Sequence, residues 1–216
     1  MLLFARHGNT FEKGEVPRII GANEDVPLTA EGRDQARALG RALKLARIPL
    51  SSIHAGPLVR TMEFAQIVAG ESGFAREIAR DLRLRELDYG HWAGLTDAEV
   101  ADQYGQAALD GWRLEGVRPS SGEWSPSEAS IRSTLRRLAS ELEDDSLCIT
   151  SNGILRYVKE LDPTAFASGR HNGGFRVKTG NLCTFNRTAE GLKLATWNER
   201  PDPGQLARIA VNSPLT

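Results

Sequence analysis

The sequence is poor in cysteine. Only Cys148 and Cys183 occur among 216 residues, and each lies within an apolar, strand-like run. Neither belongs to a CxxC motif or to a His-paired zinc spacing, so the pattern gives no sign of a zinc finger or a disulfide scaffold. Reduced thiols in the core are the favoured interpretation, and they are typical of a cytosolic protein.

An excess of charge of either sign is also absent. The chain carries 27 Lys and Arg against 28 Asp and Glu, for a net charge of −1. Bulk electrostatics therefore give no support for nucleic-acid or membrane-surface partners. No apolar run approaches the roughly 20 residues that span a bilayer, and the first apolar run, Met1 to Ala5, is too short for a signal peptide. We expect a cytoplasmic protein with neither kind of partner.

The chain does contain an alternation of strand-like and helix-like segments. Residues 2–5 form a continuous apolar run, as in a strand that is covered on both faces. Apolar residues at helical spacing occur at 29–46, 57–69 and 126–143, and further strand-like runs occur at 52–54, 77–79, 147–150, 182–185 and 192–197. Strands that alternate with helices predict an α/β fold, a three-layer α/β/α sandwich with a mostly parallel central sheet.

The length of 216 residues suits a single domain. Residues 96–125 differ from the rest, because they are polar and contain Trp112 and Trp124 among several Gly, Pro and Ser. We interpret them as a variable lid with a short helix near 98–104. The segment after 204 gives no clear pattern.

Two polar corners follow strand-like runs. Arg6, His7 and Gly8 end the first run, and residues 151–153, Ser-Asn-Gly, end another. Ligands of parallel sheets bind beyond the carboxyl ends of the strands, so both corners are candidate binding positions. Neutral histidine is a nucleophile near pH 7, Arg6 offers a planar fork of donors to phosphate oxygens, and Gly8 allows the backbone to approach a ligand. Taken alone, the tripeptide favours a structural histidine beside a surface arginine.

Two further segments add the remaining parts of a phosphate site. Arg60 falls on the first turn of a predicted helix, and Glu86 falls in a turn-rich stretch at 81–95. Phosphoryl transfer needs cations, a nucleophile and a proton donor for the leaving oxygen. Arg6 and Arg60, with His7 and Glu86, would supply this set.

These segments resemble the motifs of the histidine phosphatase superfamily, whose fold is phosphoglycerate mutase-like. The matching stretches are RHGNT (6–10), DVPLTAEGRDQA (25–36), GPLVRTMEFA (56–65), LRELDYGHWAGLT (84–96), GEWSPSEA (122–129) and TSNGILR (150–156). Each stretch is short, but the ordered set is specific and extends over residues 2 to about 198.

The resemblance implies a role for each catalytic residue. His7 matches the histidine that takes the phosphoryl group as phosphohistidine, and Arg6 and Arg60 match the arginines that hold this group. Glu86 matches the acid that protonates the leaving group and later activates water. The resemblance also implies a small phosphorylated substrate, no metal and no cofactor, and it matches residues 96–125 to a region that partly covers the pocket.

Three positions depart from the family pattern. Asn152 stands where the family normally has a second histidine, in a Ser-His-Gly corner. Lys13 replaces an asparagine common six residues after the nucleophile, and Gly56 replaces the serine of a usual Ser-Pro-Leu. The amide of Asn152 can still donate to a phosphate oxygen, but it lacks the charge of an imidazolium. One missing donor costs on the order of 10²–10³ in rate, so we expect slow chemistry rather than none.

We predict five substrate-binding residues: Asn152, Gly8, Thr10, Lys13 and Gly153. Lys13 is the best candidate to replace the missing positive charge, and a merely solvated Lys13 is an equally good interpretation.

Three other histidines are weaker candidates for that charge. His54 falls in a strand and is expected to pack. His91 lies on the Glu86 loop, and His171 lies in a Gly-rich loop at 169–174.

Three functions remain open from the sequence. The first is a phosphatase for small phosphate monoesters that acts through phosphohistidine, because the set of His7, Glu86 and the two arginines is intact. The second is an impaired family member that binds a phosphorylated ligand, because of Asn152. A phosphoglycerate mutase-type phosphotransferase is the least favoured of the three functions. The sequence identifies neither the substrate nor the oligomeric state.

Overall fold

The computed structural model describes residues 1–120, 123–167 and 174–211. These residues form one six-stranded sheet in the order β3-β2-β4-β1-β5-β6. The strands are β1 (Leu2–Arg6), β2 (Ser52–Ala55), β3 (Ala79–Arg80), β4 (Ser146–Thr150), β5 (Leu182–Thr188) and β6 (Gly191–Glu199). The first four are parallel to one another, whereas β5 runs antiparallel to β1 and β6. The predicted α/β fold with a mostly parallel sheet is confirmed.

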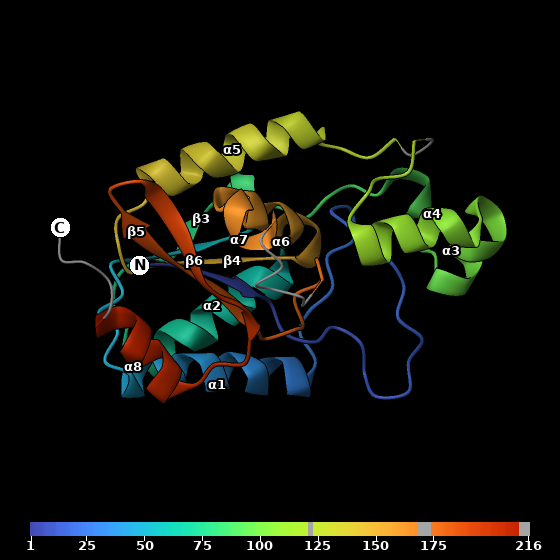
Figure 1. The fold of residues 1–216 in the computed structure, drawn as a ribbon. Coiled ribbons are helices and arrows are strands. Elements are labelled where there is room, and N and C mark those ends of the chain that lie inside the picture. The colour runs from blue at the N-terminus through green and yellow to red at the C-terminus, as the bar shows by residue number, and fades with distance from the viewer. Residues whose placement is uncertain (121–122, 168–173, 212–216) are drawn as a thin grey trace.

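Helices cover both faces of the sheet (Figure 1). One layer contains α1 (Ala30–Leu45), α2 (Val59–Ser72) and α8 (Pro203–Val211), and the other contains α5 (Glu128–Glu141), α6 (Asn152–Val158) and α7 (Pro163–Ala167). Side chains of β1 alternate between the layers: Leu3 packs in the cluster beneath α1 and α2, and Phe4 in the cluster beneath α5 and α6. Because both faces of β1 are covered, its continuous apolar run is explained.

The C-terminal segment is more ordered than the sequence indicated. Residues 203–211 form α8, which packs on α1 and buries Leu206. The turn residues at 201–204, Pro-Asp-Pro-Gly, obscured this helix, because Pro203 is its first residue and favours a helix start. Residues 96–125 also form more than the expected helix, namely α3 (Asp97–Tyr104), α4 (Gln106–Asp110) and a π-helical turn, η3 (Gly111–Glu115).

In Figure 1 α3 and α4 lie to one side of the layered part of the molecule. Trp112 and Trp124 pack edge to face, with ring centroids 4.7 Å apart, and Tyr89 contacts both rings. The tryptophans therefore pack residues 96–125 against the loop that carries Glu86.

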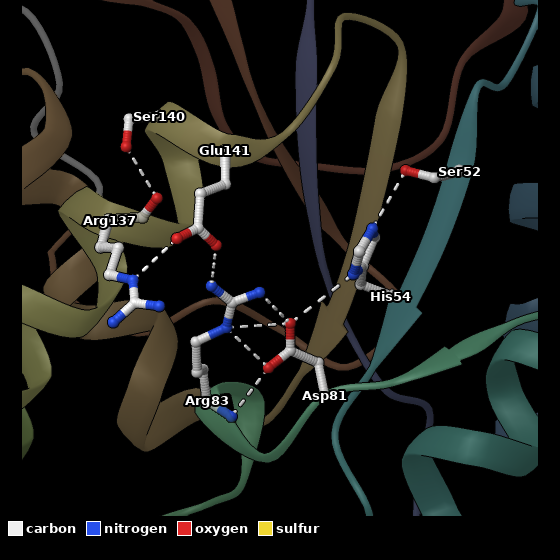
Figure 2. Close-up of polar contacts among 7 residues, drawn as sticks. All are labelled: Ser52, His54, Asp81, Arg83, Arg137, Ser140 and Glu141. Atoms are coloured by element: carbon white, nitrogen blue, oxygen red, sulfur yellow. Dashed lines mark hydrogen bonds and ion pairs between the residues drawn. The ribbon is translucent and has the colours of Figure 1, made fainter.

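A polar network fixes the segment that leads from β3 to Glu86 (Figure 2). Asp81 accepts hydrogen bonds from the backbone N–H and the guanidinium of Arg83, at 2.9 Å and 2.7 Å, and it lies 3.6 Å from Nδ1 of His54. Arg83 also pairs with Glu141 of α5. Asp81 begins the short 3₁₀ turn η1 (Leu82–Leu84), so the network sets where the following loop starts.

Candidate active site

Adjacent parallel strands bring the two polar corners together. Strand β1 pairs with β4 with Arg6 opposite Thr150, and the backbone N–H of His7 donates to the carbonyl of Thr150 at 3.0 Å. His7 and Asn152 therefore follow neighbouring strands at the same edge of the sheet. Both corners follow the carboxyl ends of strands, as predicted.

The ring of His7 is buried and oriented by its own loop. Its Nδ1 lies 2.8 Å from the carbonyl oxygen of Gly8, which can only accept, so Nδ1 carries the proton and Nε2 is left with its lone pair. Burial, and then the charges of Arg60 and Arg6, hold the pKa of His7 well below its ordinary value. The imidazole is therefore neutral at pH 7, which is the form that can attack phosphorus.

Two arginines flank this imidazole, and each is held by backbone carbonyls. Arg6 donates from Nη1 to the carbonyl of Val177 at 2.8 Å. Arg60, only 2% exposed, donates to the carbonyls of Gly21 and Glu24 at 2.8 Å and 3.0 Å. Burial and the charge of Arg176 lower the pKa of Arg6 to about 10, which still leaves it charged at pH 7. Carbonyl contacts orient both guanidinium groups without neutralising them, so their charge remains available to an anion.

Glu86 lies beside the second corner. Its Oε1 accepts from the N–H of Leu87 at 2.9 Å, and its Oε2 accepts from the N–H of Gly153 at 3.3 Å. Tyr89 follows on the same loop and is buried. Burial, and then the charge of Glu86, raise the pKa of Tyr89, so its hydroxyl stays protonated.

The side chain of Asn152 has a fixed orientation. Its Oδ1 accepts a hydrogen bond from the backbone N–H of Val177 at 2.9 Å. Since the oxygen is engaged, the NH₂ group is the part of the amide that is left for a ligand. The sequence pointed to a donor at this position, but it gave no sign of the contact with Val177.

A cleft of about 1160 Å³ opens over these residues. Seven of the predicted site residues line it: Arg6, His7, Thr10, Lys13, Arg60, Glu86 and Asn152. The side chain of Lys13 is exposed. Tyr89, Trp112, Arg113, Arg176, Lys178 and Arg200 are among the other residues that line it. Basic side chains outnumber the acidic ones, which are Glu12, Glu15, Glu31 and Glu86.

Gly8 and Gly153 are not among the cleft-lining residues. A β-carbon on Gly8 would lie 2.3 Å from the carbonyl oxygen of Gly32, so Gly8 allows the loop after β1 to pack against the start of α1. Gly56 has a similar reason, because a β-carbon there would lie 2.5 Å from the carbonyl oxygen of Leu84. Only backbone atoms of Gly8 and Gly153 can serve a ligand, and their binding role stays a prediction.

The other histidines lie in different surroundings. His54 lies in β2 within the network of Figure 2, as expected for packing, and outside the cleft lining. His91 is exposed, lies 3.8 Å from Glu123, and does not line the cleft. His171 and most of the loop at 169–174 lie outside the described residues.

Neither a metal cluster nor a membrane helix is present in the part of the chain that the structure describes. No group of three or more His, Cys, Asp or Glu within 1–120, 123–167 and 174–211 could hold a metal ion. Within the same ranges, no helix is long and apolar enough to cross a bilayer. The positive charge of the cleft comes from arginine and lysine side chains.

Comparisons with known proteins point to a family. Residues 2–200 match the Histidine phosphatase superfamily (branch 1). A 2,3-bisphosphoglycerate-dependent phosphoglycerate mutase 2 of Gloeobacter violaceus is 32% identical over 170 residues, 75% of each chain. A 2,3-bisphosphoglycerate-dependent phosphoglycerate mutase of Methylocella silvestris is 29% identical over 140 residues, and the match spans only 64% of either chain.

Solved structures share the fold. A mycobacterial glucosyl-3-phosphoglycerate phosphatase has a TM-score of 0.71 and 24% identity, with 92% of this chain and 98% of that chain covered. Bacillus stearothermophilus YhfR has a TM-score of 0.70 and 24% identity, with coverage of 95% and 98%. These likenesses confirm the phosphoglycerate mutase-like fold.

Proposed function

Because the chain belongs to the histidine phosphatase superfamily (branch 1), we propose that it hydrolyses a small phosphate monoester through a phosphohistidine on His7. The observation that carries the proposal is the tautomer of His7. Its Nδ1 proton is directed to Gly8, so the Nε2 lone pair is available in a cleft lined by Arg6 and Arg60. A neutral nucleophile beside fixed cations is what attack on a phosphate dianion needs.

The first step transfers the phosphoryl group to the protein. Nε2 of His7 forms a bond to phosphorus, and the bond from phosphorus to the ester oxygen breaks. Protonated Glu86 gives its proton to the departing alkoxide, which leaves as an alcohol. Arg6 and Arg60 stabilise the charge that spreads over the equatorial oxygens in the transition state.

The second step releases the phosphoryl group to water. Glu86, now a carboxylate, takes a proton from a water molecule as its oxygen attacks phosphorus. The bond from phosphorus to Nε2 breaks, inorganic phosphate leaves, and His7 returns to its neutral form. Glu86 is again protonated, so the cycle closes without a metal or a cofactor.

The test is an assay of phosphate-monoester hydrolysis from pH 5 to 8, with p-nitrophenyl phosphate and sugar phosphates as substrates. We expect slow release of inorganic phosphate by the wild type and none by His7→Ala. Equal inertness of both proteins, with vanadate still bound, would show that the cleft only binds its ligand. Recovery of the phosphoryl group on a second alcohol instead of in inorganic phosphate would favour a phosphoglycerate mutase-type transfer.

The second candidate function is binding of a phosphorylated ligand without useful turnover. It is favoured by the neutral amide of Asn152, which lines the cleft where the resemblance places a second histidine. Replacement of Asn152 by histidine separates the two. A gain in turnover on the order of 10²–10³ would show that the amide handicaps an enzyme, whereas a loss would show that the cleft is adapted to the amide.

A further inference from the structure

Asn152 and Arg6 hold the same peptide unit from two sides. The backbone N–H of Val177 donates to Oδ1 of Asn152 at 2.9 Å, and the carbonyl of Val177 accepts from Nη1 of Arg6 at 2.8 Å. Val177 therefore has both of its backbone polar groups bound to residues at the edge of the sheet that carries His7. We call residues 174–181 the strap.

Further hydrogen bonds fix the strap at both ends. The carbonyl of Gly174 accepts from the indole of Trp197 at 3.1 Å, and the N–H of Lys178 donates to Asn198 at 2.7 Å. The N–H of Gly180 donates to the carbonyl of Arg6 at 3.2 Å. The strap is thus tied to β6 as well as to the end of β1, and its backbone has little freedom to move away from the cleft.

Arg176 lies on this strap directly before Val177. Val177 is completely buried, whereas Arg176 is exposed and lines the cleft together with His7 and Arg6. No ion pair or hydrogen bond of the Arg176 side chain occurs among the described residues. By contrast, Arg113 of the lid lines the same cleft but pairs with Asp97.

The charges of Arg176 and Arg6 act on each other. After burial, Arg176 is the largest cause that lowers the pKa of Arg6. Two unneutralised guanidinium groups that repel across a cleft are relieved when a dianion binds between them. Arg113 also lowers the pKa of Arg6, but by less than Arg176, and Arg113 is paired with Asp97.

We propose that Arg176 is a third phosphate-binding arginine of the cleft, and that Asn152 is the positioning residue that holds it there through Val177. This inference rests on the proposed function, because it takes the transferred phosphoryl group as the ligand. It also gives Asn152 a task that an amide performs well, since its oxygen orders the strap while its NH₂ faces the ligand.

The experiment measures vanadate affinity by titration calorimetry, because vanadate binding does not require turnover. We expect Arg176→Gln to weaken binding by about 10- to 100-fold, as for loss of one charge-assisted hydrogen bond. Arg136→Gln removes the same charge from an exposed position of α5, outside the cleft lining, and should change affinity by less than about threefold. Arg176→Lys should bind vanadate more tightly than Arg176→Gln but less tightly than wild type, because lysine keeps the positive charge but lacks the planar guanidinium group.

A double-mutant cycle tests the role of Asn152. In an Asn152→Ala background, Arg176→Gln should add little to the loss, because the strap no longer holds the arginine in place. Vanadate affinity of Arg176→Gln equal to that of wild type would overturn the phosphate-binding role. Losses that simply add would overturn the positioning role.

The outcomes also separate this inference from the proposed function. If no monoester is hydrolysed but vanadate affinity depends on Arg176, the phosphatase proposal is wrong and the inference stands. If monoesters are hydrolysed while vanadate affinity is independent of Arg176, the inference is wrong and the phosphatase proposal stands. Thermal unfolding of each variant shows whether the fold is kept.

Discussion

Gly153 leaves the space that the carboxylate of Glu86 occupies. A β-carbon on Gly153 would lie 2.2 Å from Oε1 of Glu86 and 2.5 Å from the hydroxyl of Tyr89. The N–H of Gly153 also donates to Oε2 of Glu86 at 3.3 Å. The carboxylate of Glu86 can therefore occupy this place only because residue 153 has no side chain.

Gly153→Ala should displace Glu86 and leave the nucleophile in place. We expect kcat to fall by about 10- to 100-fold with alkyl phosphates, whose poor leaving groups need a proton donor, and by less with p-nitrophenyl phosphate. Steady-state kinetics with both substrates measure the difference. Gly70→Ala is the matched control, because nothing lies within 4 Å of its added β-carbon on α2. An equal fall in kcat for both substrates would contradict a specific effect on the acid.

The low pKa of His7 should make the free energy of unfolding fall as the pH is lowered below about 6.5. Its pKa in the folded protein lies well below the ordinary value of 6.5, chiefly through burial. The unfolded chain therefore binds a proton as pH falls below 6.5 while the folded protein does not, and the free energy of unfolding falls by up to about 1.4 kcal/mol per pH unit. Urea unfolding between pH 7.5 and 5.5 should show a smaller loss for His7→Gln than for wild type.

Burial also lowers the pKa of His54, although the charge of Asp81 opposes this shift. Part of the loss of stability at low pH should therefore persist in His7→Gln. The double variant His7→Gln/His54→Gln should have the flattest pH dependence. An unchanged loss of stability in His7→Gln would show that His7 is protonated equally in both states.

Asp81→Asn should destabilise the fold through the network of Figure 2. The carboxylate of Asp81 is 9% exposed and pairs with Arg83, so its neutralisation leaves the guanidinium of Arg83 with Glu141 as its remaining anionic partner. We expect the free energy of unfolding to fall by about 1–3 kcal/mol. Asp34→Asn breaks an exposed pair with Arg37 and should change it by less than about 0.5 kcal/mol. Equal effects of the two substitutions would show that the network adds nothing to stability.

The fold was largely predictable because its signals are local. The apolar run of β1, the capped helix that follows Thr29 and the alternation of strands with helices each follow from a short stretch of sequence. Helix α8 was missed, since proline and glycine at its start are typical of a turn as well as of a first helical turn.

The candidate site was predictable only in part. His7, Arg6, Arg60 and Glu86 follow from motifs and all line the cleft. Arg176 was missed because nothing in its own stretch marks it, and its position depends on backbone bonds of Val177 to Asn152 and Arg6. The sequence suggested Lys13 as the cation that replaces the charge of the second histidine, and Lys13 does line the cleft. The hydrogen bonds of the strap favour Arg176 for this role.

A trapped phosphohistidine on His7 is the most direct test of the account. Glu86→Gln removes the base of the second step, so p-nitrophenyl phosphate should phosphorylate this variant faster than water releases the group. After an alkaline quench, mass spectrometry should find one phosphoryl group on the peptide that contains His7, and none in Glu86→Gln/His7→Ala. Hydrolysis by the wild type with no phosphoryl group ever found on His7, or unchanged hydrolysis by His7→Ala, would contradict the mechanism.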